Sequence, residues 1–558
     1  MRTVLRGATV VDGTGGPSRR ADVEIVDGRI GTIGHVAADG GVGDSEVDLS
    51  GLVLCPGFVD VHTHLDAQVF WDPDLTPSSW HGVTTVVQGN CGFGIAPARP
   101  GDRDLIMDTL ELVEGMNVQT LRAGIDWRWE TFPEYLDVLR SLPKRINIAA
   151  MVPHSMVRLY VMGDEAAFSR AADDNERAAI KALVLEGLRA GAVGVTTSQA
   201  PSHQGPHGRP VPSRLADRRE VEALVEALAE HGRGIAEITY GPVYEIEDIA
   251  RLSKDHGVRI TWGSVIPGLF GGPGAAMDML ERGAAAGGDV WPQTSTRFIT
   301  TQMSLLNPYQ WSRVPAFKEV LGRAPDVKAK AYRDPEWRAR AKQQTDALAV
   351  ETDFLDGDID GYFRRISVAE TTRHEALIGV PIADLARQRD AHPLDVMLDL
   401  ALEDDLQTRF RHLSRGTYEE LRGLVTDRRA VLGAHDAGAH VDMLCDSCYP
   451  SYTLRYWVRE QEAMTLEEAV WRLSGQPAAI FGIPDRGTIA PGNAADLVAF
   501  DPQRVAETPL RRVYDFPAGG DRLISENVGI EHVWVGGTQV RRDGAPVDGA
   551  YPGVVVSG

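Results

Sequence analysis

The chain has 558 residues, a mass of 60.7 kDa and a formal net charge of −22. This acidic balance argues against nucleic acid and anionic membranes as partners. No run of about 18 apolar residues predicts a membrane-spanning helix, and the N-terminus has no apolar segment of signal-peptide type. We therefore expect a cytoplasmic location.

Four cysteines are too few for a disulfide framework in a chain of this length. Cys445 and Cys448 form a lone Cys-x-x-Cys motif. Because a structural zinc site of this kind needs a second pair of ligands, we interpret the two residues as loop thiols.

Both ends of the chain are rich in short strand patterns. Residues 1–56 alternate apolar and polar positions between glycine turns. The same pattern occurs near the other end, in ADLVAFDP and IEHVWVGGTQVRRDG. Such patterns are typical of small antiparallel hairpins. The sequence therefore predicts one small β domain, a β-sandwich formed by residues 1–56 and 490–558.

The middle of the chain, residues 57–489, has a different pattern. Short apolar runs alternate with helical segments, of which 218–232 is the most periodic, as expected for βα units and a parallel sheet. This alternation predicts an α/β fold, a (β/α)₈ TIM-type barrel. The interval 296–429 is too long for a simple connection, so we expect an insertion between strands seven and eight. The eight candidate strands are 57–64, 83–89, 147–154, 192–198, 234–238, 259–264, 289–295 and 430–438.

Polar side chains fall at the predicted strand ends, where barrel enzymes have their active sites. His62 and His64 are two positions apart at the end of the first strand, so both imidazoles face one side and could form half of a tetrahedral metal site. Cys91 follows the second strand, and Asp436 ends the eighth. Taken singly, they could be surface histidines, a core cysteine and a turn aspartate. Their joint placement favours a metal site.

Three segments resemble a known family. PGFVDVHTHLD resembles the first-strand signature of the amidohydrolase superfamily, and GVTTVVQGNCGFGIAP is similar to the second strand of its N-acyl-D-amino-acid deacylase branch. RLSGQPAAIFGIPDRGTIAPGNAADLVAFDP resembles the superfamily's return into the small sheet domain. The resemblance implies a metal-dependent hydrolase that cleaves a non-peptide C–N amide bond of a small molecule, with one or two Zn²⁺ ions. A homo-oligomer is compatible with it.

The resemblance also implies roles for individual residues. His62 and His64 would be ligands of one metal position, and Cys91 would be a ligand or a bridge. Asp436 would orient the attacking water, accept its proton and pass that proton to the leaving amine.

Two histidines of the deacylase pattern are absent. The family has them at the ends of strands five and six, where this chain has Glu237 and Trp262. Glu237 could replace one ligand because carboxylate oxygen binds zinc, whereas an indole N–H only donates. The alternative is a divergent barrel that has lost the zinc site and binds a ligand or catalyses a non-hydrolytic reaction. We expect a single ion held by His62, His64 and Asp436, with Cys91 as a further candidate ligand.

The family's His-Pro-Arg stretch, whose arginine grips the substrate carboxylate, has no equivalent after Asp436. Arg297, just past strand seven, is the alternative cation for such a clamp, although it could equally pair with a core acid. His154, at the end of strand three, and His440, beside Asp436, are further candidate substrate contacts. The sequence therefore predicts a substrate whose carboxylate is absent or differently placed.

Overall fold

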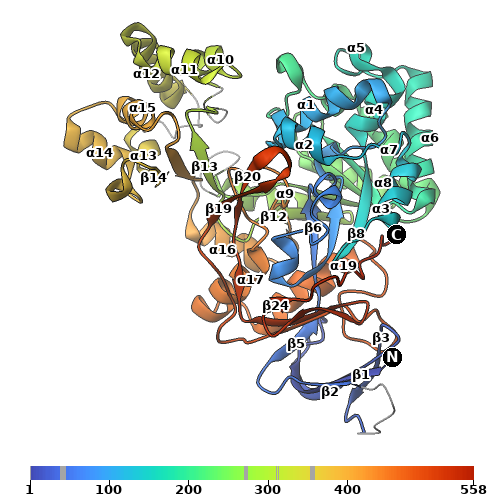
Figure 1. Cartoon of the computed structure of the whole chain (residues 1–558). Coiled ribbons are helices and arrows are strands. Elements are labelled where there is room, and N and C mark those ends of the chain that lie inside the picture. The colour runs from blue at the N-terminus through green and yellow to red at the C-terminus, as the bar shows by residue number, and fades with distance from the viewer. Residues whose placement is uncertain (1, 38–44, 269–273, 309–310, 312, 352–358) are drawn as a thin grey trace.

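The structure is a computed structural model that describes residues 2–37, 45–268, 274–308, 311, 313–351 and 359–558 (Figure 1). A parallel sheet of eight strands forms its centre, and a nine-stranded sheet lies below it in Figure 1. A third, three-stranded sheet belongs to a separate layer of helices at the upper left. Within the described ranges, no helix is long and apolar enough to cross a membrane.

The central sheet contains all eight predicted strands, so the α/β barrel class is confirmed. Its first four strands are buried along their whole length, as expected for parallel strands that are covered on both faces. A parallel bridge between Thr63 and Ala437 joins the two edges, where the His64 N–H donates to Ala437 O at 2.7 Å. The strands are β6 (Phe58–Thr63), β7 (Val83–Gln88), β8 (Asn147–Pro153), β9 (Gly194–Ser198), β10 (Ile235–Thr239), β11 (Arg259–Gly263), β12 (Val290–Thr294) and β16 (Val431–Leu432).

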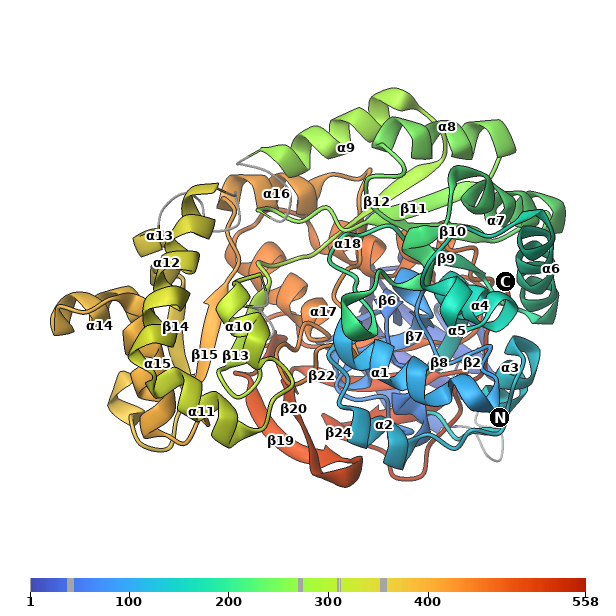
Figure 2. The same cartoon turned by 90° about the horizontal axis from the view of Figure 1, so that it is seen from above.

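Helices cover the outside of the central sheet (Figure 2). The helix predicted over 218–232 is α7, which begins after the N-cap Asp217 and ends at His231, before the C-cap Gly232 with φ +81°. A capping box formed by Asp173 and Glu176 starts α6 in the same way. The main covering helices are α1 (Arg103–Glu114), α2 (Val118–Gly124), α3 (Phe132–Ser141), α4 (His154–Met162), α6 (Asp174–Ala190), α7 (Arg218–His231), α8 (Ile246–His256), α9 (Ala275–Ala286) and α16 (Tyr418–Thr426).

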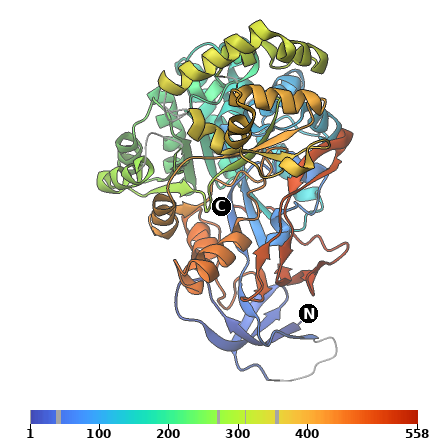
Figure 3. The same ribbon diagram turned by 90° about the vertical axis from the view of Figure 1, so that its left-hand side faces the viewer.

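Strands from the first and the last parts of the sequence form the nine-stranded sheet, in the lower part of Figure 3. Strand β17 pairs antiparallel with β5 on one side and with β22 on the other. Pro56 ends β5 and Phe58 begins β6, so this sheet continues directly into the first barrel strand. Its strands are β1 (Arg2–Val10), β2 (Arg19–Val26), β3 (Arg29–Gly34), β4 (Ser45–Asp48), β5 (Val53–Pro56), β17 (Leu497–Phe500), β22 (Ile530–Val535), β23 (Thr538–Arg542) and β24 (Ala545–Pro546).

The predicted insertion lies between β12 and β16, and Figure 2 shows its body beside the barrel rather than over it. Its own apolar core includes Trp311, Phe317 and Trp337. Three antiparallel strands form its sheet in the order β13, β15, β14. The elements are β13 (Thr300–Ser304), α10 (Pro315–Val320), α11 (Pro325–Arg333), α12 (Pro335–Glu351), α13 (Ile359–Arg364), β14 (Ile366–Glu370), α14 (Ile382–Arg389), α15 (Pro393–Glu403) and β15 (Arg409–Leu413).

Candidate metal centre

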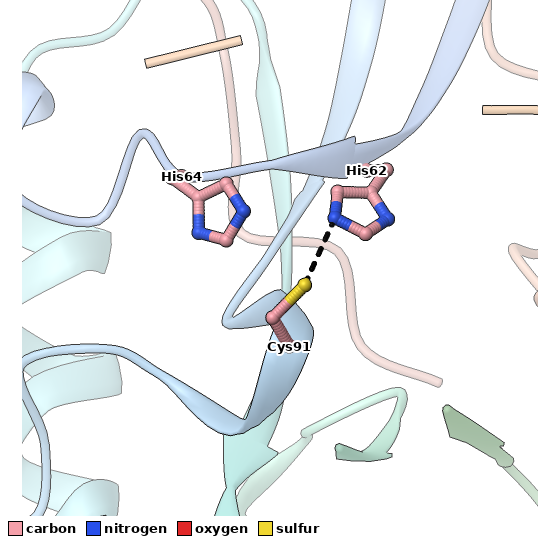
Figure 4. A group of neighbouring side chains, drawn as sticks. All are labelled: His62, His64 and Cys91. Carbon is pink, nitrogen blue, oxygen red and sulfur yellow. Dashed lines mark hydrogen bonds between the residues drawn. The ribbon is translucent and has the colours of Figure 1, made fainter. Parts of the chain in front are cut away.

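Two histidines and a cysteine converge at the ends of β6 and β7 (Figure 4). The candidate ligand atoms of His62, His64 and Cys91 all lie within 4.8 Å of one another. His62 Nε2 is 3.3 Å from Cys91 Sγ and 3.1 Å from Asp436 Oδ1, and His64 Nε2 is 3.8 Å from the same oxygen. Two ligand atoms of one tetrahedral zinc ion lie about 3.3–3.6 Å apart. The separation of His62 Nε2 from Cys91 Sγ falls within this range, whereas its separation from Asp436 Oδ1 is shorter and is that of a direct hydrogen bond.

The backbone at Cys91 and Asp436 has an uncommon conformation. Their φ angles are +56° and +48°, in the left-handed region that non-glycine residues rarely adopt. Gly89 lies in the turn before the cysteine, with φ +85°. Only glycine fits this position well, because a Cβ there would lie 2.5 Å from Met151 O. Such conformations cost about 1–3 kcal/mol each and are concentrated at functional sites. His440, with φ +50°, shares this conformation, so three of the residues that the sequence singled out have it.

Gln293 fixes the orientation of His62. Its Oε1 lies 2.6 Å from His62 Nδ1, and its Nε2 donates to Thr261 Oγ1 at 3.1 Å. Since the amide nitrogen is held by Thr261, the oxygen faces the imidazole, and His62 Nδ1–H donates to it. Nε2 is then the nitrogen directed at Cys91 and Asp436. Sequence reasoning missed Gln293, for which the available signal was a glutamine near the end of the predicted strand 289–295; the structure shows that its side chain is fully buried.

Glu237 stabilises the turn that contains Cys91. Its Oε1 accepts the Cys91 N–H at 3.2 Å and lies 3.7 Å from His62 Nδ1, the nitrogen that faces away from the cysteine thiol. Its Oε2 is buried without a hydrogen-bond partner, and burial raises the pKa of Glu237. Glu237 therefore lies next to the ligand group. Its predicted role as a ligand stays a prediction.

The charge balance of the cluster fits a divalent cation. Burial lowers the pKa of His64 to about 3, so this imidazole is neutral, and its Nε2 is buried without a hydrogen-bond partner. Burial opposes a charge on His62, but Cys91, Glu237 and Asp436 outweigh it and raise the pKa of His62. The acids that hold a proton on His62 would equally hold a metal ion, and His64 has a free lone pair to offer it.

Glu114, the last residue of α1, is a second residue that sequence reasoning missed. Its Oε2 lies 3.5 Å from His64 Nε2 and 4.0 Å from His440 Nε2. The signal was helical periodicity, because Glu114 follows Met107 and Leu110 on the buried face of α1. An acid on an apolar helix face calls for an explanation. The predicted contact His440 thus lies beside the candidate ligands, against Glu114.

The structure does not bring His154 into this site. Its Nδ1 is 2.8 Å from Thr197 Oγ1 and its Nε2 is 2.9 Å from Glu220 Oε1, and Arg158 pairs with the same carboxylate. All three members of this His154–Glu220–Arg158 group are fully buried. Both ring nitrogens of His154 are therefore engaged in this structure, and its predicted contact with substrate stays a prediction.

Arg297 is also engaged elsewhere. Its guanidinium pairs with the buried Asp446 and donates to Cys445 O at 3.2 Å. Cys448 Sγ lies 3.4 Å away, and both thiols of the Cys-x-x-Cys motif are free and buried. The structure thus has the pairing with a core acid that the sequence left open, and it gives no support to a carboxylate clamp at Arg297.

Residues 45–541 match the sequence profile of the Amidohydrolase family, so the chain belongs to this family. D-aminoacylase of Alcaligenes xylosoxydans xylosoxydans is 27% identical over 97% of this chain and 95% of that enzyme. N-acyl-D-aspartate deacylase of the same organism is 29% identical over 99% of this chain and 94% of that enzyme. Among solved structures, N-acyl-D-glutamate deacylase from Bordetella bronchiseptica, complexed with zinc and a phosphonate inhibitor, has a TM-score of 0.64 at 25% identity, over 100% of this chain and 99% of that one.

Proposed function

We propose that this protein is a metal-dependent hydrolase that cleaves the amide bond of an N-acyl amino acid or a related small amide. The observation that carries the proposal is the convergence of His62, His64, Cys91 and Asp436 at the ends of the first, second and eighth barrel strands. The deacylases that share nearly the whole length of the chain support the same reaction class. Nothing among the described residues favours the alternative of a barrel without hydrolytic chemistry.

Zinc is the cation we propose for this site, held by His62, His64 and Cys91 with Asp436 beside them. A divalent ion supplies Lewis acidity, which polarises a carbonyl group and makes water easier to deprotonate. The two imidazoles are buried, whereas the Asp436 side chain is 34% exposed and can be reached by substrate.

Asp436 would transfer a proton from the attacking water to the leaving amine. Burial would raise the pKa of Asp436, but the hydrogen bond and charge of His62 outweigh this and lower it. The carboxylate is therefore ionised at neutral pH and can accept a proton from the attacking water. The same oxygen can then deliver that proton to the leaving amine.

The partners of two arginines bear on whether the site can hold a substrate carboxylate. A cavity beside this aspartate is lined by Gln68, Asp446 and Arg522, among others. The Arg522 guanidinium is engaged by Asp515 and by Thr76, and Arg297 by Asp446. Because both guanidinium groups already have acidic partners, we propose a substrate whose carboxylate is absent or differently placed. Turnover of N-acetyl-D-methionine is expected to be well below the median enzyme rate of about 10 per second, and a rate at or above that value would contradict this choice.

Elemental analysis of the purified protein, read beside a screen of acyl amino acids and simple amides, tests the proposed reaction. We expect at least one divalent ion per chain and hydrolysis that a chelator abolishes and zinc restores. A protein that holds no metal after reconstitution and hydrolyses none of these amides would favour the non-hydrolytic alternative.

The proposal also includes a cytoplasmic location, a small-molecule substrate, no nucleic acid or membrane partner, and a homo-oligomeric assembly. The free cysteines are compatible with a reducing compartment. The net charge of −22 disfavours binding to polyanions.

A further inference from the structure

Glu114 is a buried acid in an environment that opposes its charge. The residue is 3% exposed, and its carboxylate has no lysine or arginine within ion-pair distance in the part of the chain that the structure describes. Besides burial, Asp436, Asp66 and Glu237 disfavour its negative charge, and the favourable interaction with His62 does not outweigh them. It also ends α1, and the C-terminus of a helix carries partial negative charge that disfavours an anion. An unpaired carboxylate in such surroundings would be strongly unfavourable.

Backbone contacts nevertheless fix the position of Glu114. Gly115, with φ +63°, is the C-cap that follows α1, and a Cβ on it would lie 2.9 Å from His440 Nδ1. The Glu114 carbonyl oxygen also accepts the His440 N–H. These contacts hold the end of α1 tightly against the segment that carries Asp436 and His440, with the Glu114 carboxylate facing His64.

Two states could relieve the unfavourable charge: a protonated carboxyl group, or a carboxylate bound to a cation. A protonated carboxyl group would donate a hydrogen bond to a neutral imidazole at about 2.7–2.9 Å. Glu114 Oε2 is instead 3.5 Å from His64 Nε2, and that nitrogen is buried without a hydrogen-bond partner. A separation of about 3.3–3.6 Å is the one that two ligands of a single zinc ion have.

We propose that Glu114 is a metal ligand, a carboxylate that the end of a helix supplies to the same ion as His64. This inference rests on the proposed metal centre. It gives that centre an oxygen ligand from outside the barrel strands, in a chain that has Glu237 and Trp262 at the strand-five and strand-six positions. The resulting ligand set includes a carboxylate oxygen and carries more negative charge than one built from imidazoles alone.

Glu114→Gln is the test, because glutamine keeps the shape and loses the charge. Zinc affinity is measured by competition with a chromophoric chelator, and the Co²⁺-substituted protein gives the visible ligand-field spectrum. Loss even of a residue that only orients a ligand weakens metal binding about 10–100-fold, so we expect at least a tenfold loss and a changed cobalt spectrum. Glu111→Gln, on an exposed position of the same helix, is the matched control and should leave both readouts unchanged.

The outcomes separate this inference from the proposed function. If wild type binds zinc and hydrolyses amides, while Glu114→Gln has wild-type zinc affinity and cobalt spectrum, Glu114 is a protonated core acid and only the present inference is overturned. If wild type binds no zinc, both are overturned. Circular dichroism in EDTA checks that the variant folds. Should Glu114→Gln be unfolded, Glu114→Asp keeps the carboxylate, and an unaltered cobalt spectrum in that shortened variant would refute the ligand role.

Discussion

Replacing Gln293 with leucine tests how the barrel directs the metal-binding nitrogen of His62. The substitution removes the acceptor that lies 2.6 Å from His62 Nδ1 and releases Thr261 Oγ1, in a fully buried position. Loss of such an outer hydrogen bond typically weakens metal binding about 10–100-fold, which corresponds to about 1.4–2.7 kcal/mol. The buried Nδ1–H left without an acceptor should also destabilise the fold by about 1–3 kcal/mol.

The assay is a zinc titration against a chelator, with the melting temperature measured on the same samples. Gln88→Leu is the matched control, because Gln88 on β7 is equally buried but its amide bonds to Tyr135 OH and not to a candidate ligand. It should lower the melting temperature and leave zinc affinity unchanged. If Gln293→Leu loses stability in the same way but binds zinc within twofold of wild type, the orienting role of Gln293 is refuted.

Three further predictions concern the site and its supporting wall. Replacing His62 and His64 together with alanine should remove metal and activity in parallel, and unchanged metal content would show that the ligand assignment is wrong. Asp436→Asn should fold and lose about 10²–10⁴-fold in turnover; a variant that keeps its metal and more than a tenth of wild-type turnover would exclude Asp436 as the proton carrier. Burial would raise the pKa of Glu220, but its hydrogen bond and charge interaction with His154 and Arg158 lower it to about 2 from an ordinary 4.5. Because the folded-state value is depressed, the stabilisation is present above pH 4.5 and is lost as pH falls towards 2; melting curves between pH 7 and 3 should have an acid limb that is reduced in Glu220→Gln.

The sequence predicts the barrel well because parallel strands that are covered on both faces leave unbroken apolar runs. The same logic locates the candidate ligands, because each lies at or shortly after the end of such a run: His62 and His64 at the end of β6, Cys91 three residues after β7 and Asp436 four residues after β16. Whether the domain boundaries fall at residues 57 and 490 stays a prediction. The structure adds the exact bounds of the strands and the order in which they pair.

Contacts between segments that lie far apart in the chain could not be predicted from the sequence. Nothing in the TSTRF segment indicates that Arg297 pairs with Asp446, or that the polar end of the third strand turns His154 towards Glu220. Glu114 belongs to a helix, and no strand-end rule points to it. Its signal was the conflict between a charged side chain and a helix position that periodicity predicts to be buried.

The pairing of β5 with β17 bears on how the molecule forms during synthesis. One edge of β5 stays unpaired until residues Leu497–Phe500 have been made, roughly 440 residues after Pro56. At about 5–20 residues per second, a ribosome would need about 20–90 s to supply the missing strand. An open edge is a template for unwanted strand pairing throughout that time. Because β5 leads straight into the strand that carries His62, the metal centre depends on one of the last segments of the chain to emerge.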